Sequence, residues 1–427
     1  MTSTGWAAPS YDVLVIGAGL AGLSAAARLA ESGAKVMLIA KGVGATHLGP
    51  GTIDVLGYAG GEDRAVERPG EALGGLDGDH PYARLGGADA VARSVDWFKR
   101  QFEAGPLPDY RYQGSLDENV VLPTTVGAPK PSALVPETMA AGDLRRGGSM
   151  LIVGFHVLRD FHAAYLADNV SRGGVPARSL VIDRRVDGRP EANSMGLAKA
   201  FDDPERRRLI VDEIAGRAGD AERIGFPAAL GAEDPHKVWQ DLQERLGRPV
   251  FEIPTLPPSV PGMRVFRTLR DRLRAHGGRI VMNSVAVSSE RTNGRIDSVN
   301  ATAAGRELTY RAKWIVLATG GVASGGIELD SHWQARETAL GLPLHGVPGP
   351  DEARFGPDYF GEHAFARVGV GVDEGLRPVD ASGARVAENV LVAGATLAGA
   401  RPWKEKSGDG VSLASGHRAA ELIMEES

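Results

Sequence analysis

The chain has 427 residues, which corresponds to about two or three domains, and 43% of them are hydrophobic, enough for large cores. Its formal net charge of -6 argues against nucleic acid or an anionic membrane surface as a bulk electrostatic partner. Cysteine is absent, which excludes disulfides, Fe–S clusters held by this chain and thiol chemistry, so any redox reaction needs a bound organic cofactor. No apolar run is long enough to span a membrane, and residues 1–10 lack the features of a secretion signal. We expect a cytoplasmic protein that can still dock on a membrane subunit.

The first motif is a glycine pattern near the N-terminus, within a first unit that covers residues 11–57. Residues 13–16 are typical of a buried parallel strand, and three glycines follow them in G-x-G-x-x-G spacing before an alanine-rich helix. The first glycine allows a tight turn, the second lets a phosphate approach the backbone, and the third lets the helix pack close to the sheet. The pattern predicts a nucleotide-like cofactor; the alternative is a glycine-rich turn without a ligand. The candidate binding residues are Gly17, Gly19, Leu20, Ala21 and Gly22.

A second buried strand is predicted over residues 36–39, and it ends in Ala40 and Lys41. A dinucleotide site normally has Asp or Glu at this point, which binds the hydroxyls of the adenosine ribose. The missing acid disfavours NAD and removes one of several anchors for FAD, whereas FMN has no adenosine ribose and loses nothing. Lys41 either serves a phosphate, which keeps NADPH open, or is simply solvated.

The order of the remaining elements indicates a split domain. Residues 58–253 mix charged, Pro and Gly residues with short strands at 150–153 and 180–182 and helices at 197–217 and 234–246. A proline-rich joint at 254–258 ends this insertion, because prolines disfavour helix and stiffen a linker. Strands follow at 279–282 and 295–301, then buried strands at 314–321, which ends in glycines, and at 389–394, and a last helix at 411–424. We predict an α/β protein in which a Rossmann-like binding domain, residues 11–57 and 254–427, is split by an inserted α+β cap domain, residues 58–253, with a short cap segment near 324–370.

Further binding candidates lie where the other predicted strands and the last helix meet loops. The loop 44–54 follows the second strand, and glycines end two later strands, where a cofactor can lie against the backbone. The N–H groups and dipole at the start of the last helix favour negative charge on a cofactor. Tight turns and an ordinary capped helix are the alternatives. These candidates are Thr46, His47, Thr319, Gly320, Gly321, Gly394, Gly408, Gly410 and Val411.

Catalytic residues are harder to find. The sequence contains no clear general base, no metal-ligand spacing and no Ser/His/Asp arrangement. His47 and Arg377 are weak candidates. His47 either contacts a ligand or is a satisfied loop histidine, and Arg377 either binds an anion or forms a surface salt bridge.

The motifs at 17–22, 318–321 and 391–394 resemble the two-domain flavoproteins related to the succinate dehydrogenase flavoprotein. A narrower resemblance, to the B-type subunit of the anaerobic glycerol-3-phosphate dehydrogenase, extends over nearly the whole chain. It is carried by the segments 46–54, 80–82, 254–260, 324–326 and 372–378. Some flavoproteins of the wider group link a histidine near the position of His47 covalently to the flavin. The chain departs from the family at 401–406, which is more basic and lacks a cysteine.

The resemblance implies a flavin, FMN or FAD, and together with the missing acid it favours FMN. It also implies a complex in which an FAD-containing subunit oxidises glycerol-3-phosphate to dihydroxyacetone phosphate. The present chain would relay electrons to an Fe–S subunit that docks on the inner face of the membrane, with a quinone as final acceptor. Two alternatives stay open: a stand-alone flavin-dependent dehydrogenase or reductase of a small acid, and a non-catalytic flavin-binding structural subunit.

Overall fold

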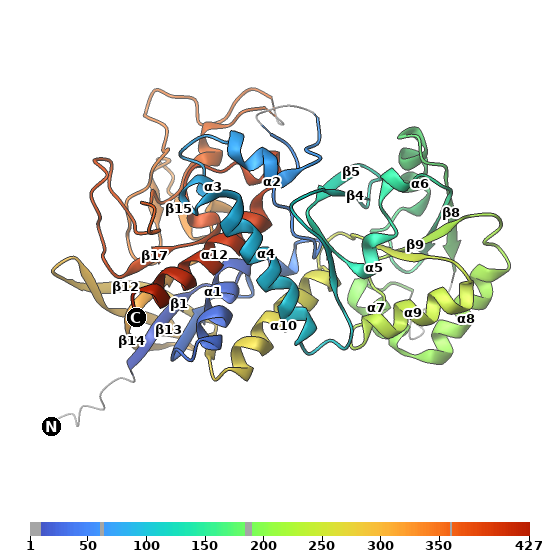
Figure 1. Cartoon of the computed structure of the whole chain (residues 1–427), viewed down its shortest axis with the longest axis horizontal. Helices are drawn as coiled ribbons and strands as arrows, with labels where there is room; N and C mark the ends of the chain where they lie inside the picture. Colours follow the sequence, from blue (N-terminus) through green and yellow to red (C-terminus); the bar gives the residue numbers. More distant parts are fainter. Residues whose placement is uncertain (1–9, 60–63, 184–189, 359–360) are drawn as a thin grey trace.

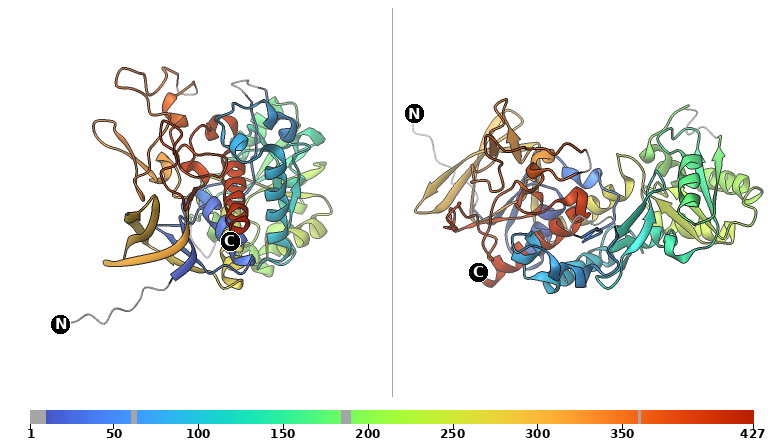
Figure 2. Two further views of the ribbon diagram at one scale, coloured as in Figure 1. Left: turned by 60° about the vertical axis from the view of Figure 1, so that its left-hand side comes forward. Right: turned by 90° about the horizontal axis from the view of Figure 1, so that it is seen from above.

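The structure of the chain is a computed structural model that describes residues 10–59, 64–183, 190–358 and 361–427. It has two lobes, a larger one formed by the beginning and the end of the chain and a smaller one formed by its middle (Figure 1). Two further views show the same division (Figure 2). Residues 1–9, for which the sequence predicts no secretion signal, lie outside the described part.

The larger lobe is built on a seven-stranded sheet in the order β11-β2-β1-β14-β13-β12, with β17 paired to β14. Strand β14 joins two kinds of pairing, because its first half runs antiparallel to β13 and its second half parallel to β1 and β17. The sheet is therefore parallel where β11, β2, β1, β14 and β17 meet. The strands are β1 (Ser10–Ile16), β2 (Val36–Ala40), β11 (Arg279–Met282), β12 (Ser284–Thr292), β13 (Arg295–Ala303), β14 (Arg306–Leu317) and β17 (Val390–Val392).

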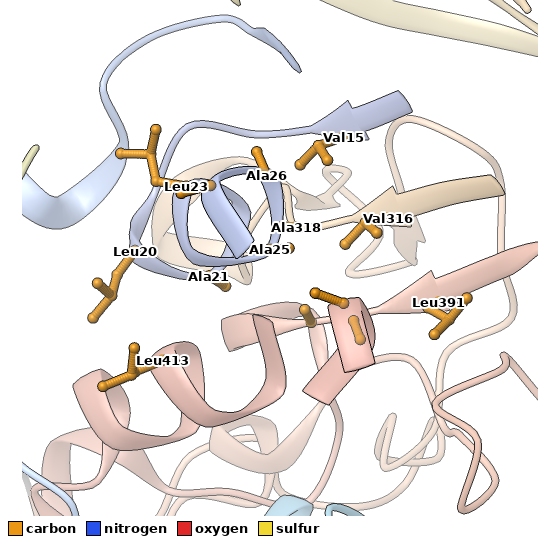
Figure 3. Packing of buried hydrophobic residues seen from close by; sticks show 14 of the residues in the cluster. Val15, Leu20, Ala21, Leu23, Ala25, Ala26, Val316, Ala318, Leu391 and Leu413 are labelled. Atoms are coloured by element: carbon orange, nitrogen blue, oxygen red, sulfur yellow. The ribbon is translucent and has the colours of Figure 1, made fainter. Parts of the chain in front are cut away.

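Helices pack against this sheet through small side chains. In Figure 3, Ala21, Ala25 and Ala26 of α1 lie between the strands that carry Val15 and Val316 and the neighbouring helix α12. A Cβ added at Gly416 of α12 would lie 2.2 Å from a backbone oxygen of α1, so the two helices pack closely only without that side chain. The helices of this lobe are α1 (Leu20–Glu31), α2 (Pro69–Ala72), α3 (Pro81–Arg84), α4 (Gly87–Glu103), α10 (Val260–Ala275), α11 (Pro402–Glu405) and α12 (Gly408–Glu425).

The smaller lobe has its own core around a four-stranded parallel sheet in the order β10-β9-β7-β8. The sequence predicts one helix over 197–217, but the structure has two, because Pro204 begins a new helix and the Asp203 side chain accepts a hydrogen bond from the N–H of Glu205 at 2.9 Å. Its elements are β7 (Met150–Phe155), α6 (Ala163–Arg172), β8 (Ala177–Ile182), α7 (Ser194–Asp202), α8 (Pro204–Ala215), β9 (Arg223–Pro227), α9 (Pro235–Leu246) and β10 (Val250–Ile253).

Short elements connect the two lobes. Two antiparallel pairs, β3 with β6 and β4 with β5, lie between them, and a small pair, β15 with β16, follows β14. Their bounds are β3 (Tyr112–Gly114), β4 (Val120–Pro123), β5 (Pro129–Ser132), β6 (Leu134–Pro136), α5 (Glu137–Ala140), β15 (Ile327–Leu329) and β16 (Ala335–Glu337). The predicted α/β fold, a Rossmann-like sheet interrupted by an inserted unit, is confirmed. Among the described residues, no helix combines the length and apolar character that a membrane crossing requires.

Candidate functional site

A cavity of about 370 Å³ opens at the carboxyl ends of β1, β2, β14 and β17. This edge of a parallel sheet is where doubly wound α/β folds bind their ligands. Ten of the residues that the sequence predicts for cofactor binding line it: Gly17, Gly19, Leu20, Ala21, Ala40, Lys41, Thr46, Thr319, Gly320 and Gly394.

The three glycines of the first motif have different surroundings. Gly17 has a φ of +116°, and a Cβ there would lie 2.2 Å from the carbonyl oxygen of Ala318. A Cβ at Gly22 would lie 2.0 Å from the carbonyl oxygen of Gly17, so Gly22 does not line the cavity but lets the helix approach the strand. A Cβ at Gly19 would meet nothing within 4 Å. Gly19 is therefore the glycine that leaves space for a ligand.

Three hydroxyl groups in the cavity lining have no hydrogen-bond partner among the described residues. They are the Oγ1 atoms of Thr46 and Thr319 and the Oγ atom of Ser284, and all three are buried. Buried polar atoms in folded proteins almost always have a partner, so these three indicate a ligand with polar groups. Such a ligand, with a phosphate at the glycine turn and polar groups further along, fits the predicted cofactor.

His47 and Arg377 do not line the cavity. The His47 ring packs edge-on against Phe266 with centroids 4.9 Å apart, and burial followed by the charge of Arg270 lowers its pKa. The Arg377 guanidinium contacts the Glu426 carboxylate at 2.5 and 2.7 Å and the carbonyl oxygen of Glu388 at 2.9 Å. Arg377 thus holds the C-terminal residues. His47 lies next to the lining residue Thr46, and its Nε2 atom is buried without a hydrogen-bond partner among the described residues.

The start of α12 reaches the cavity through different residues from those predicted. Gly408, Gly410 and Val411 do not line it, and neither does Gly321. A Cβ at Gly410 would lie 2.2 Å from the hydroxyl of Tyr82, so this glycine serves packing. Asp409 and Ser412 line the cavity instead. Their spacing of three residues, which puts both on one face of a helix, is a signal that the sequence already contained.

A buried charged cluster adjoins this end of the cavity. The Asp54 carboxylate accepts hydrogen bonds from the hydroxyls of Thr52 at 2.9 Å and Ser132 at 2.7 Å, and it pairs with the Lys130 ammonium. Lys130 comes from β5 and also lies 2.8 Å from the Thr52 hydroxyl, which belongs to the cavity lining. Burial and the charge of Asp54 raise the pKa of Asp409 to about 7, against the opposing effect of Lys130.

A second buried pair supports the start of α12. The His80 ring lies 3.1 Å from the Glu405 carboxylate, and the hydroxyl of Ser407 donates to the same carboxylate at 2.9 Å. Burial raises the pKa of Glu405, but the hydrogen bonds from His80 and Ser407 outweigh it and lower the pKa to about 2. The His80-Pro81-Tyr82 segment of the sequence motif thus acts as a support for the residues that precede Asp409.

Comparison with known proteins is consistent with this geometry. A family described as "FAD binding domain" matches residues 12–411. A relative from Halobacterium salinarum, described as a probable B-type subunit of an anaerobic glycerol-3-phosphate dehydrogenase, is 37% identical over 97% of this chain and 99% of its own length. A second relative, the corresponding anaerobic glycerol-3-phosphate dehydrogenase subunit from Pectobacterium carotovorum, is 33% identical over 97% of this chain and 99% of its length. The chain belongs to this family of FAD-binding proteins.

Membership identifies the chain as a flavin-dependent oxidoreductase. The matching family binds FAD, so the preference for FMN is not supported; the missing ribose carboxylate is only one anchor in a cavity lined by many backbone groups. Among solved structures, a 3-ketosteroid delta1-dehydrogenase from Sterolibacterium denitrificans covers 98% of this chain, and the chain covers all of it (100%), at 14% identity and a TM-score of 0.44.

Proposed function

We propose that this chain binds FAD in the cavity and serves as a flavin subunit of a complex that oxidises glycerol-3-phosphate to dihydroxyacetone phosphate. One observation carries the proposal: Gly19 faces open space at a glycine turn, in a chain that is 37% identical over nearly its full length to a relative described as a subunit of such a dehydrogenase. Bound FAD supplies reversible two-electron redox chemistry. The flavin-binding domain would comprise residues 11–57 and 254–427 together with α2, α3 and α4, which pack in the larger lobe. The rest of the predicted cap, residues 58–253 and a segment near 324–370, would remain as cap.

The extent of the cavity supports FAD over the shorter FMN. From the glycine turn the lining continues in one direction to Lys41 at the end of β2 and to Val285 in β12. In the other direction it reaches Ala395 and Asp409 at the start of α12. A phosphate at the turn leaves room on both sides, for an adenosine half near β2 and a ring system near α12.

The lining favours a role in electron transfer over direct oxidation of the substrate in this chain. Among the described lining residues, Lys41 and Asp409 are the only ionisable ones, and no histidine or arginine is present to bind a phosphorylated substrate or abstract its proton. The chain contains no cysteine and so holds no Fe–S cluster by thiolates. Electrons would therefore pass from a catalytic FAD subunit through this flavin to an Fe–S subunit at the inner membrane face, and on to a quinone.

The test is flavin extraction from the purified native chain, with chromatography to separate FAD from FMN. A Gly19→Val variant should fold and lose the flavin, because its side chain occupies ligand space and meets no protein atom at the Cβ position. Gly74→Val is the matched control, since Gly74 is exposed and an added Cβ there also meets nothing within 4 Å. Native protein without flavin would contradict the proposal. Substrate-dependent bleaching of the isolated chain would instead favour a stand-alone dehydrogenase.

A further inference from the structure

The cluster of Asp54, Lys130 and Asp409 is not explained by flavin binding alone. Its members come from three distant parts of the chain: the loop after β2, strand β5 and the first turn of α12. The backbone brings two of them together, because the N–H of Gly410, the residue after Asp409, donates to the Asp54 carbonyl oxygen at 2.9 Å. Two carboxyls and one ammonium thus meet at the wall of the cavity.

The charges of this cluster do not balance when all three groups are ionised. The side chains of Lys130 and Asp54 are 13% and 8% exposed, so water screens them little. One ammonium neutralises one carboxylate, and the second carboxylate, on the partly exposed Asp409, would remain without a cation next to the buried Asp54, which is unfavourable. A bound proton removes this imbalance.

The two carboxyls differ in their hydrogen-bond partners. Asp54 accepts from two hydroxyls and from the Lys130 ammonium. Asp409 lines the cavity and is partly exposed. The positive end of the α12 dipole favours its ionised form, but the neighbouring Asp54 charge and burial act against it.

We propose that Asp54, Lys130 and Asp409 form a proton-exchanging site on the cavity wall, in which the Asp409 carboxyl takes up one proton when negative charge enters the cavity. The proposal adds a role to the proposed flavin site, and it depends on bound flavin only as the source of the negative charge. Reduction of a flavin by two electrons and one proton adds one negative charge; the Asp409 carboxylate then accepts a second proton from solvent, and no other bond changes. The electrons come from the reductant of the reductive half-reaction.

Three other ionisable side chains near Asp409 have pKa values far from neutrality. Burial raises the pKa of Tyr82 and of Tyr112 well above the ordinary value, so both hydroxyls stay neutral. Glu405, whose pKa is about 2, stays ionised beside His80. Of these four groups, Asp409 is the one whose pKa lies near neutrality.

The first experiment needs no flavin. Infrared spectra of the flavin-free full chain, recorded as a function of pH, should show a protonated carboxyl band that disappears as the pH rises through neutrality. The band should be absent in Asp409→Asn, remain in Asp297→Asn, an exposed aspartate outside the cavity lining, and shift to higher pH in Lys130→Met, which removes the compensating cation. A band that persists in Asp409→Asn, or its absence from the unmodified chain, would overturn the proposal.

The second experiment uses the flavin-loaded chain and measures the midpoint potential of the flavin against pH. Uptake of one extra proton per two electrons should steepen the slope by about 30 mV per pH unit, since a tenfold concentration change corresponds to 29.6 mV for a two-electron couple. The flavin that Asp409→Asn retains should lack this extra slope. An unchanged slope in that variant would refute the redox link. If no flavin binds at all, the proposed function fails, but the infrared result still decides whether the proton site exists.

Discussion

Replacing Arg264 by methionine should destabilise the contact between the two lobes. The Arg264 guanidinium, on α10, contacts both carboxylate oxygens of Glu252 at 2.7 and 3.1 Å and donates to the carbonyl oxygens of Leu230 and Gly231 at 3.1 and 2.9 Å. The side chains of Arg264 and Glu252 are 2% and 0% exposed. Removing one partner of such a buried pair leaves an uncompensated charge and costs about 3–5 kcal/mol.

The same helix provides a matched control. Arg267 pairs with Glu233 at 3.0 Å, but these side chains are 35% and 74% exposed, and an exposed pair contributes about 1 kcal/mol at most. Urea unfolding of Arg264→Met and Arg267→Met should be followed by circular dichroism and by the fluorescence of Trp239, the only tryptophan between residues 150 and 253. Similar losses of unfolding free energy in the two variants would refute the view that Arg264 joins the lobes.

Three further predictions concern pH and ligand binding. The pKa of Glu405 is lowered from 4.5 to about 2 in the folded chain, so its pairing with His80 stabilises the fold above pH 4.5, and this stabilisation is lost as the pH falls towards 2. Glu405→Gln should therefore flatten the acid limb of the profile of melting temperature against pH. An unchanged limb would contradict this. Burial lowers the pKa of His417 from 6.5 to about 4, so the unfolded chain binds more protons and stability falls as the pH drops through this window; His417→Leu should reduce that fall, and an equal fall in both proteins would argue against it. Thr319→Val should weaken FAD binding by about 1–3 kcal/mol, measured by titration of the flavin-free chain. The melting temperature of the flavin-free chain should stay equal or rise, because the substitution removes a buried hydroxyl without a partner among the described residues. A large loss of stability would show that the hydroxyl has an internal role.

Local patterns explain why much of the fold was predictable. The strands 13–16 and 36–39 and the turn at Asn293-Gly294 depend on neighbouring residues, and the structure has β1, β2 and the β12–β13 hairpin there. The break at Pro204 was also local, but the apolar periodicity on both sides concealed it. The distribution of buried residues between two cores, by contrast, depends on contacts between distant segments.

The charged end of the site could not be predicted in the same way. Lys130 meets Asp54 across 76 residues of chain, and no spacing rule connects a strand of the insertion with a loop of the first unit. The sequence favours His47 by its type and its loop, yet its ring packs against Phe266 and is not part of the cavity lining. Side-chain direction in irregular loops follows from tertiary packing, which the sequence does not state.

The free energy of the cavity itself argues for a resident ligand. Without a ligand, the hydroxyls of Thr46, Ser284 and Thr319 are buried and have no partner among the described residues, and each such group costs about 1–3 kcal/mol. Gly19 adds a further cost. No side chain covers its backbone, and glycine loses more conformational entropy on folding than any other residue. A fold that keeps these costs together at one edge of its sheet is most stable when a polar, phosphate-bearing ligand supplies the missing partners. Binding of FAD should therefore stabilise the larger lobe, whose sheet carries the cavity, more than the smaller lobe, whose separate core lies around β7 to β10.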